Sequence, residues 1–301
     1  MSQPNYLVVF NPIPNRARKK QLDLLLRHLN DQKLQWQLYP TDENMSVNQH
    51  YFRQHISEYT DVIVVGGDGT LHNVVNCLGE SSTVRLGLVP AGTGNDFAQW
   101  LYGNKKNDEE HVFAIVTGTQ YTNISLGKCQ FSDNTFRLFH NVLGLGFDAM
   151  LAKELTGSKG LFGSLGYLVK SVQTLPFFNA GTLTLRELYK SKTYDNLITA
   201  FANAPYFGGG MKIAPEANAE LPSLEMCRIE MLPKFTMLVQ ILRLFNGSHV
   251  NKPYTDYRRL DYAVEVENTG ADIQADGEYI GQSPCRISVI PEALKIKKPA
   301  D

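Results

Sequence analysis

The sequence lacks several features that mark common classes of protein. Its charge is nearly balanced, with 29 Lys and Arg against 30 Asp and Glu, so no net field would draw the whole chain to nucleic acid or to an anionic membrane. No apolar run approaches the roughly 20 residues that cross a bilayer; residues 237–245 are interrupted by Gln240 and Arg243. The N-terminus shows no secretory pattern. We expect a cytoplasmic protein that contacts a membrane only peripherally.

Cysteine is also scarce, and its spacing is not that of a metal site. Cys77, Cys129, Cys227 and Cys285 lie far apart in the sequence. This spacing predicts reduced thiols and argues against a zinc site or a disulfide framework. The histidines are scattered as well, and neither a repeat nor a low-complexity linker is present.

The pattern of apolar residues predicts two domains in 301 residues, since single cores stop growing near roughly 250 residues. In residues 1–120, apolar strands alternate with helical segments, which predicts a doubly wound parallel α/β sheet. In residues 121–290, short strands dominate, which predicts a β-sandwich. The expected strands include residues 135–143, and two helices are expected at 167–175 and 236–246.

The first candidate site follows the short apolar run Val62–Val65. In the next residues, three glycines surround the single carboxylate of Asp68, and a helical pattern follows. Glycines allow a close approach to a ligand, and the free N–H groups of a helix start attract phosphate. Asp68 would need a cation between itself and a phosphate, so the loop predicts a nucleotide with Mg²⁺. The alternative is a plain helix start with Thr70 as N-cap.

Two further loops follow strands in the same way. After residues 86–89, Gly92 and Gly94 flank Thr93, and Asn95 or Asp96 could cap the next helix. Because carboxyl ends of parallel strands share one edge, both loops would face one crevice. A third loop begins at Asn11, after residues 6–10, and its basic residues could hold phosphate or be solvated.

Two carboxylates, Asp276 and Glu278, flank Gly277 near the C-terminus. In a strand they would share one face, and close like charges make one of them a better proton acceptor. The alternative is a solvated hairpin turn, because Asp-Gly is a strong hairpin signal. The sequence does not decide which carboxylate would be the base.

Together these residues resemble the diacylglycerol kinase catalytic family, which includes bacterial lipid kinases related to the sphingosine kinases. Five motifs match nearly end to end: GGDGT at 66–70, PAGTGND at 90–96, NVLGLGFD at 141–148, GGGMKIAP at 208–215 and DGE at 276–278. The first motif also occurs in NAD kinases and is similar to a phosphofructokinase loop, but all five in order are specific. The resemblance implies an N-terminal NAD kinase-like α/β domain and a C-terminal β-sandwich, with a cleft between them. It also implies that residues 291–301 return to the first domain.

The resemblance implies an ATP- and Mg²⁺-dependent kinase of diacylglycerol or a similar lipid alcohol, with a place in phospholipid biosynthesis. Asp68 would contact Mg²⁺, and Asp276 or Glu278 would take the hydroxyl proton, with Asp68 the next candidate. Asp96 would link to Arg16. The implied nucleotide-binding set is Asn11, Arg16, Thr41, Gly66, Gly67, Asp68, Gly69, Thr70, Leu71, His72, Gly92, Thr93, Asn95 and Asp96.

The acceptor would carry an apolar tail. Residues 161–178 form a long apolar stretch with glycines, which suggests a lipid entrance, although such a stripe is more often core. Transient membrane contact is expected and nucleic acid is not, while the oligomeric state, a homodimer included, stays open.

The chain departs from the family pattern in three places. Pro14, Asn15 and Arg16 replace Ser-Gly-Lys of the first loop, and Ser125 replaces an aspartate. Leu221-Pro222 replaces an Asp-Gly pair that often binds an accessory metal in the family. We therefore expect the accessory site to be lost, with its remaining positions at Asn218, Leu221 and Ser223. Two alternatives follow: a degenerate nucleotide- or lipid-binding protein without activity, and an NAD-kinase-like enzyme with a soluble substrate.

Overall fold

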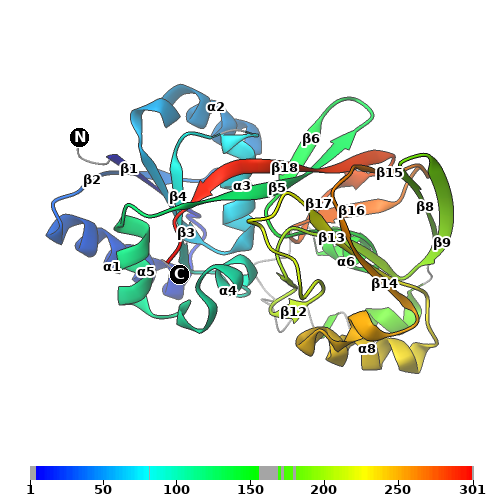
Figure 1. The fold of residues 1–301 in the computed structure, drawn as a ribbon. Helices are drawn as coiled ribbons and strands as arrows, with labels where there is room; N and C mark the ends of the chain where they lie inside the picture. The colour runs from blue at the N-terminus through cyan, green and yellow to red at the C-terminus, as the bar shows by residue number, and fades with distance from the viewer. Residues whose placement is uncertain (1–4, 81, 156–168, 171–172, 179–180, 300–301) are drawn as a thin grey trace. The chain divides into compact units, whose positions relative to one another are not determined.

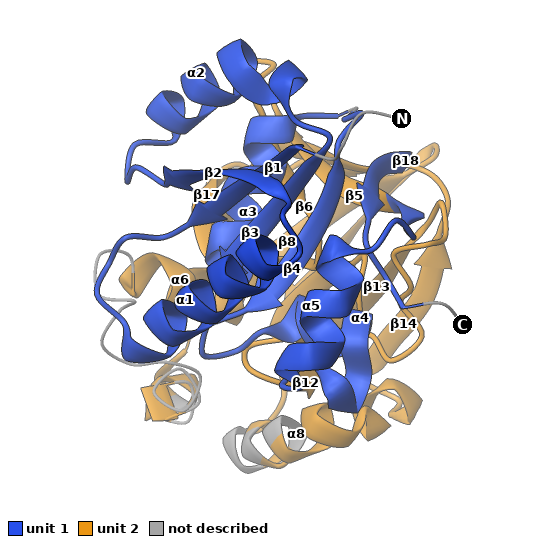
Figure 2. Cartoon of the chain, turned by 90° about the vertical axis from the view of Figure 1, so that its left-hand side faces the viewer, with its two compact units in different colours: residues 1–124, 292–301 blue, residues 125–291 orange. Residues whose placement is uncertain are grey.

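The computed structural model describes residues 5–80, 82–155, 169–170, 173–178 and 181–299. The chain divides into two compact units (Figure 2), one of residues 1–124 with 292–301 and one of residues 125–291. Two long strands, β5 (Thr122–Phe131) and β18 (Cys285–Ile296), run from one unit into the other.

The first unit is built on a parallel sheet with the strand order β2-β1-β3-β4-β18 (Figure 1). All six residues of β3 are buried, as expected of a central parallel strand. Because the strands are parallel, the loops after β1 to β4 all leave one edge of the sheet. The strands are β1 (Asn5–Phe10), β2 (Gln35–Pro40), β3 (Asp61–Gly66) and β4 (Arg85–Pro90).

Helices alternate with these strands, as the apolar spacing predicts. Asn15, Asn44 and Asp108 cap three of them through their side chains. The helices of this unit are α1 (Arg16–Asp31), α2 (Met45–His55), α3 (Asp68–Leu78), α4 (Asp96–Tyr102), α5 (Glu109–Thr117) and the 3₁₀ turns η1 (Ile56–Glu58) and η2 (Gly103–Lys105).

A buried ion cluster fixes the C-terminal segment to this unit. The Nζ of Lys297 lies 2.6 Å from Oδ1 of Asp61 and donates to the carbonyl oxygen of Gly118 at 2.7 Å. Arg85 pairs with the other Asp61 oxygen, also at 2.6 Å. Burial lowers the pKa of Lys297, but this arrangement satisfies the charge, and removing one partner would leave a buried charge unpaired.

The second unit is an antiparallel β-sandwich. One sheet has the order β14-β13-β10-β7-β16-β17, and the facing layer contains β9, β8, β15, β5, β6 and the first half of β18. Apolar residues from both layers, such as Phe139, Phe201 and Ile287, form the core between them. Its other strands are β6 (Phe136–Phe139), β7 (Val142–Gly146), β8 (Gly181–Glu187), β9 (Lys190–Asn196), β10 (Ile198–Ala202), β13 (Leu224–Ile229), β14 (Thr255–Leu260), β15 (Val264–Val266), β16 (Asp272–Ala275), β17 (Glu278–Gln282) and the short pair β11 (Tyr206–Phe207) and β12 (Met211–Lys212). The predicted fold class is confirmed.

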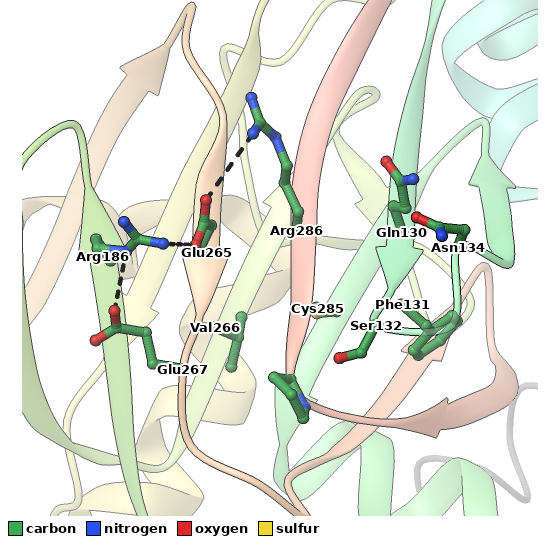
Figure 3. Close-up of a pocket in the computed structure, with 11 residues that line it drawn as sticks. Gln130, Phe131, Ser132, Asn134, Arg186, Glu265, Val266, Glu267, Cys285 and Arg286 are labelled. Atoms are coloured by element: carbon green, nitrogen blue, oxygen red, sulfur yellow. Dashed lines mark hydrogen bonds and ion pairs between the residues drawn. The ribbon is translucent and has the colours of Figure 1, made fainter.

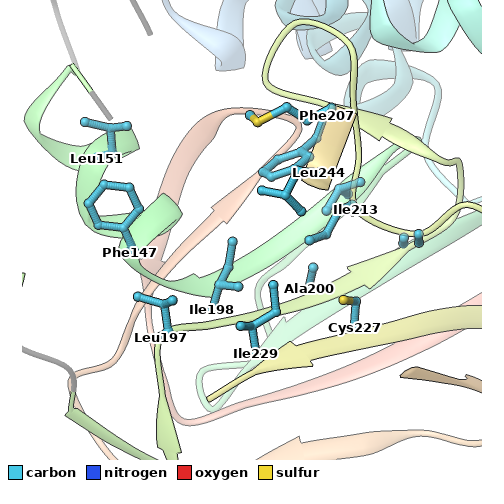
Figure 4. Close-up of a cluster of buried hydrophobic side chains, with 14 of the residues drawn as sticks. Phe147, Leu151, Leu197, Ile198, Ala200, Phe207, Ile213, Cys227, Ile229 and Leu244 are labelled. Atoms are coloured by element: carbon cyan, nitrogen blue, oxygen red, sulfur yellow. The ribbon is translucent and has the colours of Figure 1, made fainter. Parts of the chain in front are cut away.

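A helical layer contributes a second core to this unit. Phe147 and Leu244 pack with Ile198 and Ile229 of the six-stranded sheet (Figure 4). The layer comprises α6 (Phe147–Glu154), α8 (Lys234–Asn246) and the 3₁₀ turns η4 (Leu175–Phe177) and η5 (Ser248–Asn251). The helix predicted at 236–246 is confirmed as α8, whereas most of 167–175 and of the apolar stretch 161–178 lies outside the described residues.

Several sequence-based boundaries in this unit are wrong. The strand predicted at 135–143 is two strands, β6 and β7, with a break at residues 140–141. β9 and β14 were not expected, because their polar residues, KSKTYDN and TDYRRL, give no clean apolar alternation.

Candidate active site

The two predicted phosphate loops of the first unit touch through their backbones. The Ala91 N–H donates to the Gly66 carbonyl at 2.9 Å. A Cβ built on Gly67 would lie 2.9 Å from the Cα of Gly92, and one built on Gly92 would lie closer still to Gly67. Only glycine allows such an approach. The loops after β3 and β4 therefore form one continuous surface.

Asp68 ties these loops together with its carboxylate. Its Oδ2 accepts from the Asp96 N–H and its Oδ1 from the Phe97 N–H, both at 3.0 Å. These donors are the first N–H groups of α4, which a helix start leaves without a helical partner. Asp68 is half-buried, and a carboxylate offers about four acceptor positions. The tether therefore leaves acceptor capacity for a cation.

The start of α3 differs from the alternative in which Thr70 is the N-cap. Gly67, not Thr70, is the N-cap residue, and no side chain caps this helix. The N–H groups of Thr70 and Leu71 both donate to the Gly67 carbonyl at 3.1 Å, and the nucleotide contact predicted for these two residues stays a prediction. His72 lies deeper in the helix and is buried. The N–H groups of Asp68 and Gly69, which open the helix, are the ones placed for an anion.

The second loop is closed by Asn95. This residue has a left-handed backbone (φ 53°), its Oδ1 accepts from the Gly92 N–H, and its Nδ2 donates to the Gly92 carbonyl, each at 2.9 Å. The side chain thus holds the backbone of Gly92 in place beside Gly67. Any contact of Asn95 with a nucleotide would come from its backbone.

The side chain of Arg18 holds the first loop. Nη1 of Arg18 donates to the carbonyl oxygens of Asn11 (3.1 Å) and Ile13 (2.9 Å), and burial lowers the pKa of Arg18. Arg16 is exposed while Asp96 is buried, so the link predicted between them stays a prediction. Thr41 follows β2, where its N–H donates to the Phe10 carbonyl at 2.9 Å.

In the second unit, the Asp276-Gly277 pair forms a hairpin turn and not part of a strand. Asp276 (φ 53°) and Gly277 (φ 83°) both have left-handed backbones and join β16 to β17. Two central residues with positive φ are typical of a type I′ turn. The expectation that Asp276 and Glu278 share one strand face is therefore wrong.

The Asp276 carboxylate accepts several hydrogen bonds from its own unit. It accepts the N–H groups of His140 (3.2 Å), Asn141 (2.9 Å) and Val142 (3.2 Å), and Nδ1 of His140 lies 2.9 Å from its Oδ2. The Asp276 side chain has no exposure. Sequence reasoning missed His140, because it stands outside every motif. Glu278, by contrast, begins β17 and is partly exposed.

Asp148 is a third carboxylate with a structural environment. It is buried, and Nε2 of Gln274 donates to its Oδ2 at 2.9 Å. A side chain on Gly144 would overlap the carboxylate, so the glycine makes room for it. Burial raises the pKa of Asp148 to about 6, although the Gln274 hydrogen bond opposes the shift.

The residues at the family's accessory metal site do not fit a metal. Oγ of Ser125 donates to the Leu221 carbonyl at 2.7 Å, and the Ser125 N–H donates to the Ala219 carbonyl at 2.7 Å. The Leu221 N–H donates to the Asn218 carbonyl, and the Glu220 N–H donates to Oδ1 of Asn218, both at 3.0 Å. The oxygens of Asn218 and Leu221 thus accept hydrogen bonds within the chain, and Ser125 and Leu221 supply no side-chain carboxylate. Ser223 offers only a hydroxyl and a carbonyl.

A cavity of about 490 Å³ lies elsewhere in the second unit, on β5, β8, β15 and β18 (Figure 3). Its charges neutralise one another: Arg186 pairs with Glu265 and Glu267, and Arg286 lies 3.9 Å from Glu265. None of the predicted site residues lines it. It offers no net charge to a nucleotide.

Comparison with protein families decides the identity of the fold. The diacylglycerol kinase catalytic domain matches residues 5–129, and the YegS C-terminal NAD kinase β-sandwich-like domain matches residues 141–298. The chain belongs to the diacylglycerol kinase catalytic family. The predicted family is confirmed.

Relatives and solved structures agree with this family. A diacylglycerol kinase of Mycobacterium tuberculosis is 28% identical over 83% of this chain and 81% of its own, and one of Staphylococcus haemolyticus is 24% identical over 98% and 88%. A crystal structure of a diacylglycerol kinase from Bacillus anthracis has the same fold (TM-score 0.70, 15% identity, 99% of this chain and 98% of that chain). An NAD kinase from Archaeoglobus fulgidus in complex with ATP is more distant (TM-score 0.53, 12% identity, 98% and 93%).

Two physical properties of this family member complete the description. Cys77, Cys129, Cys227 and Cys285 all carry free thiols. Within the described residues, no helix combines the length and the hydropathy needed to cross a membrane.

Proposed function

We propose that the protein is an ATP- and Mg²⁺-dependent lipid kinase that phosphorylates diacylglycerol or a similar lipid alcohol. The observation that carries the proposal is the joint between the two glycine loops, where Gly67 meets Gly92 and Asp68 bridges to α4. Relatives named diacylglycerol kinase support the class of acceptor, and the NAD kinase complex supports ATP as donor.

The loops of the first unit would bind and orient the triphosphate. The N–H groups of Asp68 and Gly69, together with the backbone from Gly92 to Thr93, would hold its oxygens, and Thr41 would lie at the nucleoside. Asp68 would hold Mg²⁺ directly or through water. When bound, the metal ion neutralises charge on the phosphates.

Glu278 is the proton acceptor in this proposal. As the lipid oxygen bonds to the γ-phosphorus, the bond from phosphorus to the ADP oxygen breaks, and the hydroxyl proton passes to Glu278. The three N–H donors around Asp276 stabilise it as a carboxylate and occupy its oxygens. Asp276 therefore positions the turn that carries Glu278.

A transfer assay with γ-labelled ATP tests the proposal against its two rivals. The acceptor panel should contain diacylglycerol, a sphingoid base, phosphatidylglycerol and NAD, with and without Mg²⁺. Label in a lipid alcohol that depends on Mg²⁺ is the expected result. Label in NAD alone would favour the soluble-substrate kinase, which the NAD kinase fold makes a real alternative. ATP binding with no transfer to any acceptor would favour the degenerate protein, which the changes at Ser125 and Leu221 make worth testing.

We also propose a cytoplasmic location, which the free thiols support. The acceptor would be reached by transient contact with the membrane surface.

A further inference from the structure

Three large apolar side chains are exposed on the helical layer of the second unit. Phe177 of η4 is 80% exposed, and Leu242 and Phe245 of α8 are 71% and 41% exposed. η4 packs against α8, and Leu242 and Phe245 are three residues apart, which places them on one helix face. We call these three residues the α8–η4 surface.

The exposed side chains are not a result of loose packing, because both elements also face inward. Met237 and Leu244 of α8 are buried in the core beneath the layer, and Figure 4 shows Leu244 there. Phe178, next to Phe177, packs edge-on against Phe147 with ring centroids 5.4 Å apart. A surface helix normally turns a polar face to water. Here both faces of α8 carry large apolar residues.

The two segments of the sequence that carry this surface contain basic residues but no acidic ones. Residues 155–178 and 231–254 contain no Asp or Glu, although the chain has 30 in all. The same two segments contain the basic residues Lys159, Lys170, Lys234, Arg243 and Lys252. The acidic residues just before them are paired, Glu154 with Lys170 at 3.7 Å and Glu230 with Arg228 at 3.3 Å. Because Lys170 is paired with Glu154, the described side chains that leave these segments positively charged are those of Arg243 and Lys252. An apolar surface beside positive charge complements an anionic lipid surface.

We propose that the α8–η4 surface docks on an anionic lipid bilayer. Phe177, Leu242 and Phe245 would enter the headgroup region, and the side chains of Arg243 and Lys252 would face anionic headgroups. The proposal rests on the proposed function in one respect: a kinase of a long-chain lipid alcohol must reach the bilayer that holds its acceptor. Because the chain has almost no net charge, this attraction would be local.

Vesicle co-sedimentation tests the docking surface without ATP. The full chain is mixed with vesicles of phosphatidylcholine, with and without phosphatidylglycerol, at low and high salt. We expect binding to the phosphatidylglycerol vesicles that weakens as salt rises. Leu242→Glu and Phe177→Glu should each lower the partition constant by at least about tenfold, since burying one such side chain is worth roughly that factor or more.

Tyr189→Glu is the matched control. Tyr189 is 98% exposed and lies at the turn between β8 and β9. β8 begins soon after η4 in the sequence and leads to this turn. Its seven residues span roughly 23 Å. The control should bind vesicles like the wild type. Phe177→Ser provides a milder variant, and thermal unfolding confirms that each variant is folded.

Three results would overturn the proposal: a wild type that does not sediment with phosphatidylglycerol vesicles, binding unaffected by both Phe177 and Leu242 variants, or an equal loss in Tyr189→Glu. Activity separates this proposal from the kinase itself. Leu242→Glu should retain turnover of a water-soluble short-chain diacylglycerol and lose turnover of a long-chain one in vesicles. If the wild type phosphorylates neither substrate but still binds vesicles as expected, the proposed function fails and the docking surface stands.

Discussion

Asp68 of the first unit and Asp276 of the second hold distant backbone segments in the same way, yet they differ in what they leave free. Asp68 accepts two N–H groups from the start of α4 and is half-buried. Asp276 accepts three N–H groups from residues 140–142, lies against His140 and has no exposure. Both occur in glycine-rich motifs that look equally functional in the sequence.

The difference shows how a carboxylate's hydrogen bonds limit its chemistry. A carboxylate with free lone pairs and access to solvent can hold a cation, whereas one surrounded by donors is fixed as an anion. Asp68 thus combines a structural tether with the proposed contact to Mg²⁺, and Asp276 serves as an anchor. In the proposed function the chemistry of the DGE motif is therefore assigned to Glu278. Substitutions at five positions test and extend this division of roles.

The largest effect is expected at Glu278. Glu278→Gln removes the proton acceptor but keeps the shape of the side chain, so kcat should fall by about 10²- to 10⁴-fold. The Kd for ATP and the melting temperature should stay as in the wild type. Glu110→Gln, which changes an exposed carboxylate of α5, controls for the loss of one charge. Wild-type kcat in Glu278→Gln under chemistry-limited conditions would place the base elsewhere.

Asp68→Asn should lower turnover by about 10²- to 10³-fold, because it removes one negative charge beside the phosphates. Asparagine can still accept an N–H from α4, so the fold should survive. Asp68→Ala should reduce turnover equally and also lower the melting temperature, because two N–H groups lose their acceptor. Steady-state kinetics with Mg²⁺ and ATP, paired with thermal unfolding, would show both effects. An Asp68→Asn enzyme as active as the wild type is incompatible with the proposed role.

Asp276→Asn should mainly destabilise the second unit. The new NH₂ group would face backbone donors, so the free energy of unfolding should fall by about 2–3 kcal/mol. Denaturant unfolding measures this, and Glu278→Gln is the matched control in the same hairpin. A variant with unchanged stability but a kcat lowered as far as that of Glu278→Gln would reverse the roles given to these two carboxylates.

Much of this division of roles among the carboxylates could be predicted from the sequence. What could not be predicted has physical causes. Glycines around Asp68 and Thr93 indicate the two loops that meet at Gly67 and Gly92, because local backbone freedom is visible in the residue type. For Asp276 the sequence allows both a strand and a hairpin turn, because Asp-Gly is a turn signal and is also part of the DGE motif. The sequence does not decide between them. The partners of the carboxylates were not predictable: His140 lies 136 residues from Asp276, and Ser125 lies 96 residues from Leu221.

Asp148 adds to the comparison a buried carboxylate that has too few hydrogen-bond donors to stabilise its charge. Because its pKa is raised from 3.8 to about 6 in the folded state, the folded protein holds this proton more tightly than the unfolded chain. This stabilisation is complete below about pH 4 and is lost as pH rises to about 6. Asp148→Asn keeps an acceptor for Gln274 and does not ionise. It should be more stable than the wild type at pH 8 by up to about 3 kcal/mol, with the gap closing near pH 4. Chemical denaturation at both pH values checks this, and an equal difference at both would contradict it.

At Ser125 a hydroxyl stands where the family pattern has an aspartate. This hydroxyl binds the Leu221 carbonyl directly, in a loop where the family's aspartates would favour a metal ion. Ser125→Ala should lower the free energy of unfolding by about 1–2 kcal/mol, because it leaves that carbonyl without its donor. Ser223→Ala, in the same loop and partly exposed, is the control and should have little effect.

Adding EDTA should change neither the wild type nor Ser125→Ala in thermal unfolding. The triple variant Ser125→Asp, Leu221→Asp and Pro222→Gly should instead gain stability with added Mg²⁺. Tight Mg²⁺ binding by the wild-type loop in titration calorimetry would contradict the view that a hydroxyl has taken the place of the metal.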